Sequence, residues 1–252
     1  MAFVEAALSR DSFLNGRLSI LQPRLGYRAA TDPILLASAI AARPGQSALE
    51  LGCGAGVGIL ALAARVPGLT LAGLERQADY AELARRNAAE NTIDLTVWTG
   101  DLNAMPEALR AQRFDHVFAN PPFHPPAATP GHDSGRDAAL REDTPLEDWL
   151  DAGLRRLVAG GRITLVHRAE RLPALLSALD GRAGAIAVRP LAAREGRPAG
   201  RVLLQARKGA RGPFRLLAPL ILHSGQCHLR DGDDFSPQAR AILRDAAPLH
   251  WD

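Results

Sequence analysis

Residues 47–58 have the sequence SALELGCGAGVG, and this stretch decides the fold. Its first part, Ser47–Leu51, is a short and mostly apolar run of the kind that forms a buried strand. Glycines follow at alternate positions, and the mostly apolar run Ile59–Arg65 then predicts a helix. A strand, a glycine loop and a helix in this order are typical of a parallel βαβ unit, so the sequence predicts an α/β fold.

The spacing of the glycines bears on the kind of ligand. A dinucleotide fingerprint, G-x-G-x-x-G/A, fits only from Gly56 to Ala61, well after the strand ends, whereas Gly52-x-Gly54-x-Gly56 begins where the strand stops. The second register therefore fits better. Glycines let the backbone approach a ligand closely, and the N–H groups at the start of the helix favour an anionic group such as a carboxylate or phosphate.

Three further strands are each followed by, or end in, a polar side chain. The strand predicted over residues 69–75 ends in Glu75, whose carboxylate could accept both hydroxyls of a ribose. The next predicted strand is followed by Asp101, which could meet an adenine amino group or could equally belong to a solvated turn. The third is followed by Asn120. Right-handed crossovers place these strand ends on one edge of the sheet, so we expect the four groups around one ligand.

The strand predicted over residues 114–119 leads into a loop stiffened by proline, Asn120-Pro121-Pro122-Phe123-His124. The Asn120 side-chain carbonyl and the Pro121 backbone carbonyl can each accept a hydrogen bond from an amino group. Phe123 could stack on a planar ring. The loop therefore predicts a site that holds the amine of a planar substrate. An Asn-Pro turn beside a core phenylalanine is the purely structural alternative.

The regions before this βαβ core predict a hairpin and a helix. Apolar and polar residues alternate over residues 12–28, as in a short hairpin. Asp32 is expected to be the N-cap of a helix whose first residue is Pro33 and whose apolar run ends at Ala42.

The remaining chain continues the alternation of helices and strands. The predicted elements are helix 77–91, strand 95–99, a long loop 124–143 placed where a substrate lid would lie, helix 145–158, strand 162–167, helix 171–180, and a hairpin of strands 185–189 and 201–207. A polar tail from Asp231 leads into a short helix.

Composition narrows the class of protein. Of the 252 residues, 47% are hydrophobic and 23% are charged, as in a globular domain, and no apolar run is long enough to span a membrane. The N-terminus lacks the pattern of a secretory signal, and two cysteines without metal or redox spacing fit a reducing compartment, so a cytoplasmic location is expected. No metal is expected, because His223, Cys227 and His228 do not complete a zinc site.

Basic residues cluster in two regions. Residues 189–215 contain eight arginines or lysines and one acid, and an N-terminal group is formed by Arg10, Arg17, Arg24 and Arg28. Such patches suit contacts with the phosphates of a nucleic acid. A bias towards arginine codons is the other explanation, because Lys208 is the only lysine in the sequence.

Together these motifs resemble the class I S-adenosylmethionine (SAM)-dependent methyltransferases that act on planar amino groups. The residues that carry this resemblance are Glu50–Gly56, Glu75, Asp101 and Asn120–Phe123. A closer resemblance, over about residues 12–208, is to the bacterial valine-tRNA adenine methyltransferases, which methylate the exocyclic amine of adenine 37 in the anticodon loop. It rests on Gln22–Arg28, Thr31–Leu36, the Asn-Pro-Pro-Phe loop and Gly161–Leu165.

The resemblance implies a doubly wound, seven-stranded and mostly parallel sheet with an antiparallel C-terminal hairpin. It implies a SAM site made of Asp32, Glu50, Gly52, Gly54, Gly56, Glu75, Asp101 and Asn120. The catalytic residues would be Asn120, Pro121, Pro122 and Phe123, with the amine of a flipped-out adenine held by the Asn120 and Pro121 carbonyls and its ring stacked on Phe123. No general base is needed, because the charged sulfonium drives the reaction. RNA contacts are expected from Arg28, His124, Arg194, Arg197 and Arg201.

The resemblance also implies a division into three parts and a set of partners. Residues 1–43 would form a hairpin and helix that cap the cofactor site, residues 44–210 the catalytic domain, and residues 211–252 a C-terminal extension. RNA, most simply a tRNA, is the expected partner, without a membrane or an obligate protein partner.

Other functions fit parts of the pattern. The Phe123-His124 pair is also similar to ribosomal-RNA guanine-amine methyltransferases, and the Asn-Pro-Pro-aromatic loop is shared with the enzymes that methylate glutamine in release factors. A small-molecule methyltransferase and a non-catalytic SAM-binding module are further alternatives. Asn120 and Glu75, which a dead enzyme would be expected to lose, are both present.

Overall fold

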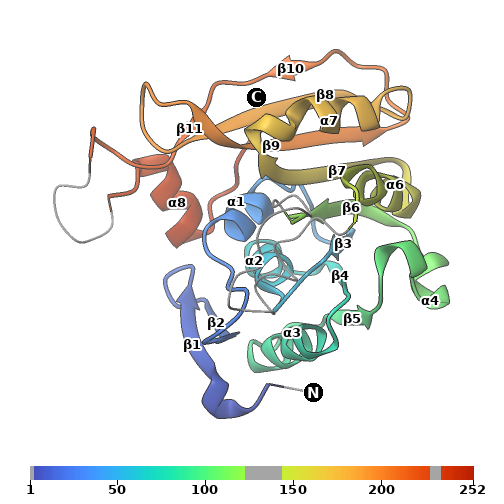
Figure 1. Ribbon diagram of the computed structural model, residues 1–252, viewed down its shortest axis with the longest axis vertical. Helices are drawn as coiled ribbons and strands as arrows, with labels where there is room; N and C mark the ends of the chain where they lie inside the picture. The colour runs from blue at the N-terminus through green and yellow to red at the C-terminus, as the bar shows by residue number, and fades with distance from the viewer. Residues whose placement is uncertain (1–2, 123–143, 228–233) are drawn as a thin grey trace.

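The computed structural model describes residues 3–122, 144–227 and 234–252, and its centre is one large sheet (Figure 1). The strands of this sheet are β3 (Ser47–Leu51), β4 (Thr70–Glu75), β5 (Thr96–Thr99), β6 (Phe114–Ala119), β7 (Leu157–Arg168), β8 (Ala183–Ala192), β9 (Ala199–Lys208), β10 (Arg215–Leu216) and β11 (Leu220–Ile221). Their order is β10-β8-β9-β7-β6-β3-β4-β5, with β11 also paired to β8. All neighbours run parallel except β9, which is antiparallel to both β7 and β8. The predicted mostly parallel sheet with an antiparallel hairpin is confirmed.

Within the described residues the sheet has two strands more than the seven expected. The additional strands, β10 and β11, are two residues long and both pair with β8 at the edge of the sheet. A two-residue strand carries no alternation of apolar and polar residues, so the sequence pattern does not reveal it.

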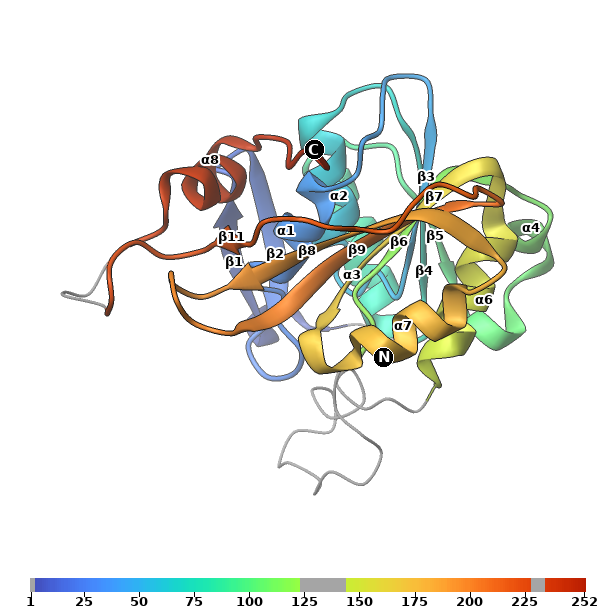
Figure 2. The same ribbon diagram turned by 90° about the horizontal axis from the view of Figure 1, so that it is seen from above.

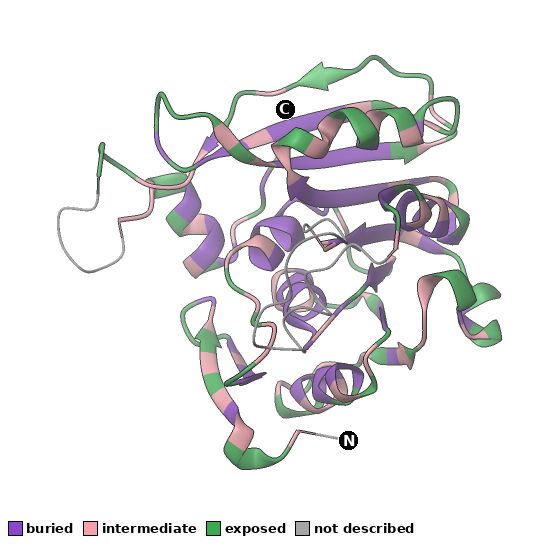
Figure 3. Ribbon diagram, in the orientation of Figure 1, coloured by how far each residue is buried: buried purple, intermediate pink, exposed green. Residues whose placement is uncertain are grey.

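Helices cover both faces of the sheet. They are α1 (Asp32–Ser38), α2 (Val57–Arg65), α3 (Ala78–Glu90), α4 (Glu107–Arg110), α6 (Leu146–Arg156), α7 (Leu172–Leu179) and α8 (Pro237–Asp245). One buried cluster contains apolar residues of α1, α2 and α8, and a second contains those of α4, α6 and α7. Figure 2 shows α1 and α2 on the opposite side of the strands from α6 and α7. The sheet is therefore doubly wound, and its central strands are buried (Figure 3).

The N-terminal hairpin forms a sheet of its own. Strands β1 (Leu8–Phe13) and β2 (Leu18–Pro23) pair antiparallel, so the hairpin is confirmed but begins earlier than the predicted residue 12. The side chain of Asn87 on α3 joins β2 to the main body, because it accepts the Leu21 N–H at 2.8 Å and donates to the Leu21 carbonyl at 3.0 Å.

Helix α1 differs from the prediction at both ends. Its N-cap is Thr31, and Asp32, which was expected to be the cap, is the first helical residue. The helix ends at Ser38 rather than at Ala42, because other segments bond to the carbonyls that would extend it. The Leu249 N–H bonds to the Ser38 carbonyl at 2.9 Å, and Trp251 Nε1 bonds to the Ala39 carbonyl at 2.7 Å.

The junction between α6 and β7 also differs from the prediction. The helix ends at Arg156, and β7 begins at Leu157, five positions before the expected Arg162. Leu157 pairs with Phe114, and a bulge between Phe114 and His116 absorbs the change of register. Among the described residues, no helix combines the length and the apolarity that crossing a membrane requires.

Candidate active site

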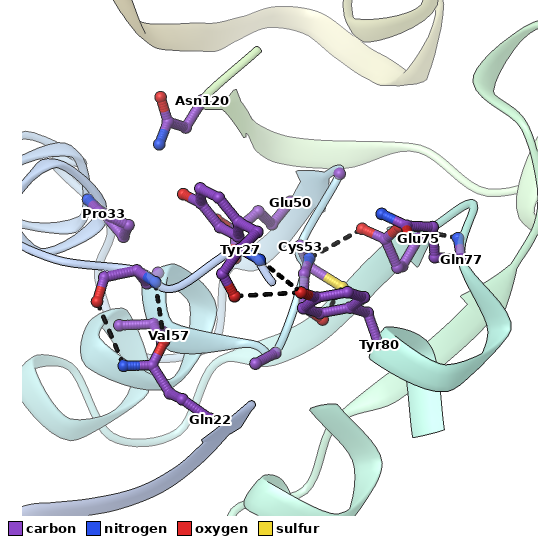
Figure 4. A pocket seen from close by; sticks show the side chains of 15 residues that line it. Gln22, Tyr27, Pro33, Glu50, Cys53, Val57, Glu75, Gln77, Tyr80 and Asn120 are labelled. Atoms are coloured by element: carbon purple, nitrogen blue, oxygen red, sulfur yellow. Dashed lines mark hydrogen bonds between the residues drawn. The ribbon is translucent and has the colours of Figure 1, made fainter. Parts of the chain in front are cut away.

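Two adjoining cavities lie at the carboxyl ends of β3, β4 and β6. Their volumes are about 560 and 610 Å³, and both open to solvent. They share four lining residues, Gly52, Glu75, Gln77 and Asn120, and so form one continuous cleft. Figure 4 shows the first cavity with Asn120 on one side and Cys53 and Glu75 on another. The glycine loop and Asn120 therefore face one cleft.

The register of the sheet explains this convergence. Leu51 is paired with Ala119 on one side and with Leu74 on the other. Asn120, Gly52 and Glu75 therefore lie at the ends of β6, β3 and β4, in this order across the sheet. Neighbouring strands are about 4.8 Å apart. The sequence predicts these groups at one edge of the sheet, and in the structure they line one cleft.

The backbone of Gly52 is conformationally demanding. Its φ is +67°, and a Cβ built there would lie 2.7 Å from Cη2 of Trp149, closer than real carbon atoms approach. Gly54 and Gly56 also have positive φ angles. The three glycines of the predicted register thus let the loop turn sharply at the mouth of the cleft.

Glu75 ties the glycine loop to the end of β4. One carboxylate oxygen accepts the Gly54 N–H at 2.9 Å and the other accepts the Gln77 N–H at 2.8 Å. Burial raises the pKa of Glu75, and these N–H groups oppose the rise. A carboxylate has about four lone-pair positions, so those left over can accept the hydroxyls of a ribose.

Glu50 is buried behind the same loop, and its environment differs from the expectation of a free helix terminus. Its Oε2 accepts the Ile59 N–H at 2.7 Å, which occupies one of the N–H groups offered to an anionic ligand. Burial, together with the negative charge of Glu75, raises the pKa of Glu50 to about 8, and the Ile59 bond lowers it. At neutral pH Glu50 is therefore mostly protonated. It caps α2 and lines the first cavity.

Asp101 both forms a turn and lines the cleft, the two roles that the sequence left open. Its Oδ1 accepts the Asn103 N–H at 2.8 Å, as in an Asp turn that starts the short 3₁₀ helix Leu102–Ala104. It also lines the second cavity. The carboxylate is therefore held by its own turn at the edge of the cleft.

Asn120 is the most chemically distinctive group in the cleft. Its Oδ1 is buried and has no hydrogen-bond partner in the part of the chain that the structure describes. A buried acceptor without a partner costs about 1–3 kcal/mol, and a ligand N–H can recover this cost. Pro122 lines the second cavity beside it. Phe123, His124 and the predicted loop 124–143 lie outside the described residues.

Some lining residues escaped the sequence analysis. Tyr80 Oη accepts the Tyr27 N–H at 2.8 Å and donates to the Tyr27 carbonyl at 3.1 Å, which holds the segment before α1 against α3 (Figure 4). Burial and the negative charges of Asp32 and Glu50 raise the pKa of Tyr27, so its hydroxyl keeps its proton. Tyr27 lies within Gln22–Arg28, one of the stretches on which the family resemblance rests. That resemblance is the one signal in the sequence that could have marked Tyr27 as a cleft residue.

Asp32, placed in the cofactor site by resemblance, lies near the cleft without lining it. Its neighbour Pro33 lines the first cavity instead. The Asp32 carboxylate accepts an ion-pair contact from Arg201 Nε at 3.3 Å, which links α1 to β9.

The expected RNA-contacting arginines fall into different environments. Arg28 pairs with Asp11 at 2.6 Å, and Arg197 is exposed in the turn between β8 and β9. Arg194, by contrast, is 7% exposed and bonds to Asp234 at 2.6 Å and to the Ser224 and Gly225 carbonyls. These contacts hold the C-terminal segment and occupy the Arg194 guanidinium.

The histidine and cysteine residues near residue 223 do not form a metal centre in the described residues. His223 Nδ1 lies 2.6 Å from Asp234 Oδ1, and its ring stacks on Phe235. No group of three or more His, Cys, Asp or Glu side chains that could hold a metal occurs in the described ranges. His228 lies outside them.

Known proteins resemble this chain in sequence and fold. The family model described as "Methyltransferase small domain" matches residues 30–179. A tRNA1(Val) (adenine(37)-N6)-methyltransferase of Porphyromonas gingivalis is 32% identical over 171 residues, which are 64% of this chain and 67% of that protein. The protein of the same name from Dickeya chrysanthemi is 27% identical and covers 95% of both chains. A crystal structure from Agrobacterium tumefaciens, described as a predicted O-methyltransferase, superimposes with a TM-score of 0.70 at 28% identity, over 86% of this chain and 98% of that one.

The cleft fits SAM, the cofactor of such methyltransferases. SAM carries hydrogen-bond donors in its ribose diol and its adenine amino group, and the cleft is lined by the acceptors Glu75 and Asp101 and by a glycine loop that a ligand can approach closely. The family model covers more than half of the chain and includes the glycine loop, Glu75, Asp101 and Asn120. On this evidence the chain belongs to the methyltransferase small domain family.

Proposed function

We propose that the protein transfers a methyl group from SAM to the exocyclic amine of an adenine in RNA, most simply in the anticodon loop of a tRNA. The observation that carries this proposal is the buried Asn120 Oδ1, an acceptor without a partner among the described residues, in the cleft that also contains the glycine loop. An amide oxygen in this position suits a substrate that brings an N–H donor.

The proposed roles follow from hydrogen-bond chemistry. When bound, SAM supplies an electrophilic methyl group on a charged sulfonium. The Asn120 Oδ1 and the Pro121 carbonyl would each accept one hydrogen of the amine, which directs its lone pair away from the ring and towards the methyl carbon. Methyl transfer would exchange the C–S bond of SAM for a C–N bond, and the Asn120 and Pro121 carbonyls would hold the amine hydrogens until one of them leaves to water.

The glutamates of the cleft have other roles in this proposal. Both Glu50 and Glu75 accept backbone N–H groups, which shape the glycine loop. Glu75 would in addition bind the ribose hydroxyls, and Asp101 the adenine amine of the cofactor. Phe123 would stack on the target base, and Pro122 would keep the loop stiff.

RNA is favoured as the substrate by charge and by the relatives. Arg197 and Arg201 lie on the loop and strand that follow β8, at the same edge of the sheet as the cleft, because Arg201 pairs in register with Arg168 at the carboxyl end of β7. With Arg28 and His124 they would contact phosphates. The two curated relatives reported above are named as methyltransferases of adenine 37 in a valine tRNA. A tRNA substrate would place the protein in the cytoplasm.

Mass spectrometry of nucleosides tests this proposal. The protein is incubated with SAM and total tRNA, and the RNA is digested to nucleosides. We expect N6-methyladenosine, and the Asn120→Ala variant is expected to form it about 100- to 1,000-fold more slowly, a loss larger than any change in its affinity for SAM. N2-methylguanosine formed only in ribosomal RNA would support the guanine alternative instead. Methylation of protein alone would support glutamine methylation, and no product with any acceptor would contradict an enzymatic role.

A further inference from the structure

Trp149 on α6 forms part of the wall of the cleft. The side chain is 8% exposed and lines the second cavity. A Cβ built on Gly52 would lie 2.7 Å from its Cη2 atom and 3.0 Å from its Cζ3 atom. The benzene part of the indole therefore packs directly against the backbone of the glycine loop. This contact fixes the ring and, with it, the direction of the indole N–H.

The indole N–H of Trp149 has no acceptor among the described residues, and Nε1 is buried. Trp251 shows the usual arrangement, since its Nε1 donates to the Ala39 carbonyl at 2.7 Å. Buried indole N–H groups almost always find a partner, because leaving one unpaired costs free energy. Because Trp149 lines the second cavity, a ligand bound there is one source of the missing acceptor.

The position of Trp149 indicates which ligand supplies this acceptor. Most residues that line the second cavity come from the ends of β4 and β5, in the stretches 74–77 and 100–102. These stretches contain Glu75 and Asp101, the groups suited to the ribose and the amino group of the cofactor. Both carboxylates are acceptors, so neither can pair with the ring nitrogens of an adenine, which also accept. Trp149 is a donor that can.

We propose that Trp149 Nε1 donates a hydrogen bond to a ring nitrogen of the cofactor's adenine. In this arrangement α6 contributes a specificity contact that the glycine loop and the two carboxylates do not provide. The side chain of Asn103 supports the position of α6, because its Nδ2 bonds to Asp148 Oδ2 at 3.1 Å and so joins the helix to the turn after Asp101. The inference rests on SAM as the cofactor and is independent of the RNA substrate.

Calorimetry with S-adenosylhomocysteine tests this contact in the full-length protein. Trp149→Phe keeps an aromatic ring against Gly52 and removes the N–H. We expect its affinity for S-adenosylhomocysteine to fall about 5- to 15-fold. Its Tm without ligand should fall less than that of the Trp251→Phe control, because no hydrogen bond to a described residue is lost and only packing changes.

Trp251→Phe is the matched control, since the same atoms are removed where the N–H has a partner. We expect its Tm to fall by about 2–4 °C and its affinity for S-adenosylhomocysteine to stay unchanged. If Trp149→Phe binds S-adenosylhomocysteine as tightly as wild type does, the proposal is wrong. The same holds if only the KM for RNA rises, because Trp149 would then face the substrate.

Analogues separate a hydrogen bond from packing. In each of three S-adenosylhomocysteine analogues, one ring nitrogen at position 1, 3 or 7 of the adenine is replaced by a C–H group. We expect wild type to bind one of them about 5- to 15-fold more weakly than the parent compound, and Trp149→Phe to bind that analogue and the parent compound equally. A loss of affinity in Trp149→Phe that is the same for the parent and all three analogues would show that packing alone is involved.

Discussion

The two halves of the sheet use their polar side chains in opposite ways. Around β3, β4 and β6 the polar groups of Glu50, Glu75 and Asn120 line a cleft. Around β8 and β9 two of the arginines bond to the protein itself. Arg194 holds Asp234, and Arg189 donates to the His250 and Asp252 carbonyls at 2.9 and 3.1 Å. A charged residue in a sequence therefore indicates a ligand only if the fold leaves part of its hydrogen-bonding capacity free at a cleft or at the surface.

Replacing Gly52 or Gly196 with alanine compares the half of the sheet that lines the cleft with the half formed by β8 and β9. Gly52 and Gly196 have similar φ angles of +67° and +71°, but a Cβ would meet Trp149 at Gly52 and no described atom within 4 Å at Gly196. We expect Gly52→Ala to lower the free energy of unfolding by about 2–4 kcal/mol, from backbone strain plus overpacking. Gly196→Ala should cost only about 1 kcal/mol, from strain alone. Urea unfolding measures both, and equal costs would contradict the described packing of Trp149.

The buried carboxyl of Glu50 gives the cleft a pH dependence. Its pKa rises from 4.5 to about 8 on folding, so the folded state holds a proton that the unfolded state releases. The resulting stabilisation is complete below about pH 4.5 and is lost as the pH rises through 8. We expect Glu50→Gln to have a higher Tm than wild type at pH 8 and a flatter curve of Tm against pH between 5 and 8. An unchanged curve would show that Glu50 is ionised in the folded protein.

Substitutions at Arg194 and Arg197, three positions apart, compare a buried arginine that bonds to the protein with an exposed one. We expect Arg194→Met to lower the free energy of unfolding by about 1–2 kcal/mol, because it leaves Asp234 and two carbonyls without this donor. Arg197→Met removes an exposed side chain and should change it by less than about 0.5 kcal/mol. Chemical unfolding of both variants measures the difference. Similar losses for the two variants would remove the distinction between structural and surface arginines in this half.

RNA binding gives the smallest expected effect. We expect Arg197→Ala to weaken binding of tRNA about 2- to 5-fold at low salt and to reduce the slope of log affinity against log salt by about 1. Arg113→Ala is the control, because Arg113 is exposed just before β6, at the opposite edge of the sheet from the cleft. Fluorescence anisotropy over a range of salt concentrations measures both. A larger effect at Arg113 would place the RNA on the other edge.

The sequence predicted the parts of the fold that depend on local pattern. Alternating strand and helix periodicity located β3 to β6 with the intervening helices, and chain connectivity alone then placed Gly52, Glu75, Asp101 and Asn120 on one edge. Features set by distant residues were not accessible. Helix α1 ends early because residues 249 and 251 bond to its last carbonyls, and Arg194 is structural because Asp234 lies 40 positions further along the chain.

The contact between Trp251 and the end of α1 has a consequence for how the protein is made. Pro33 of α1 lines the cofactor cleft, while the residue that binds the end of this helix follows Ala39 by 212 positions. A chain emerging from the ribosome presents its N-terminal part first. The wall of the cleft formed by α1 therefore gains its final hydrogen bonds only after every strand of the sheet has been translated.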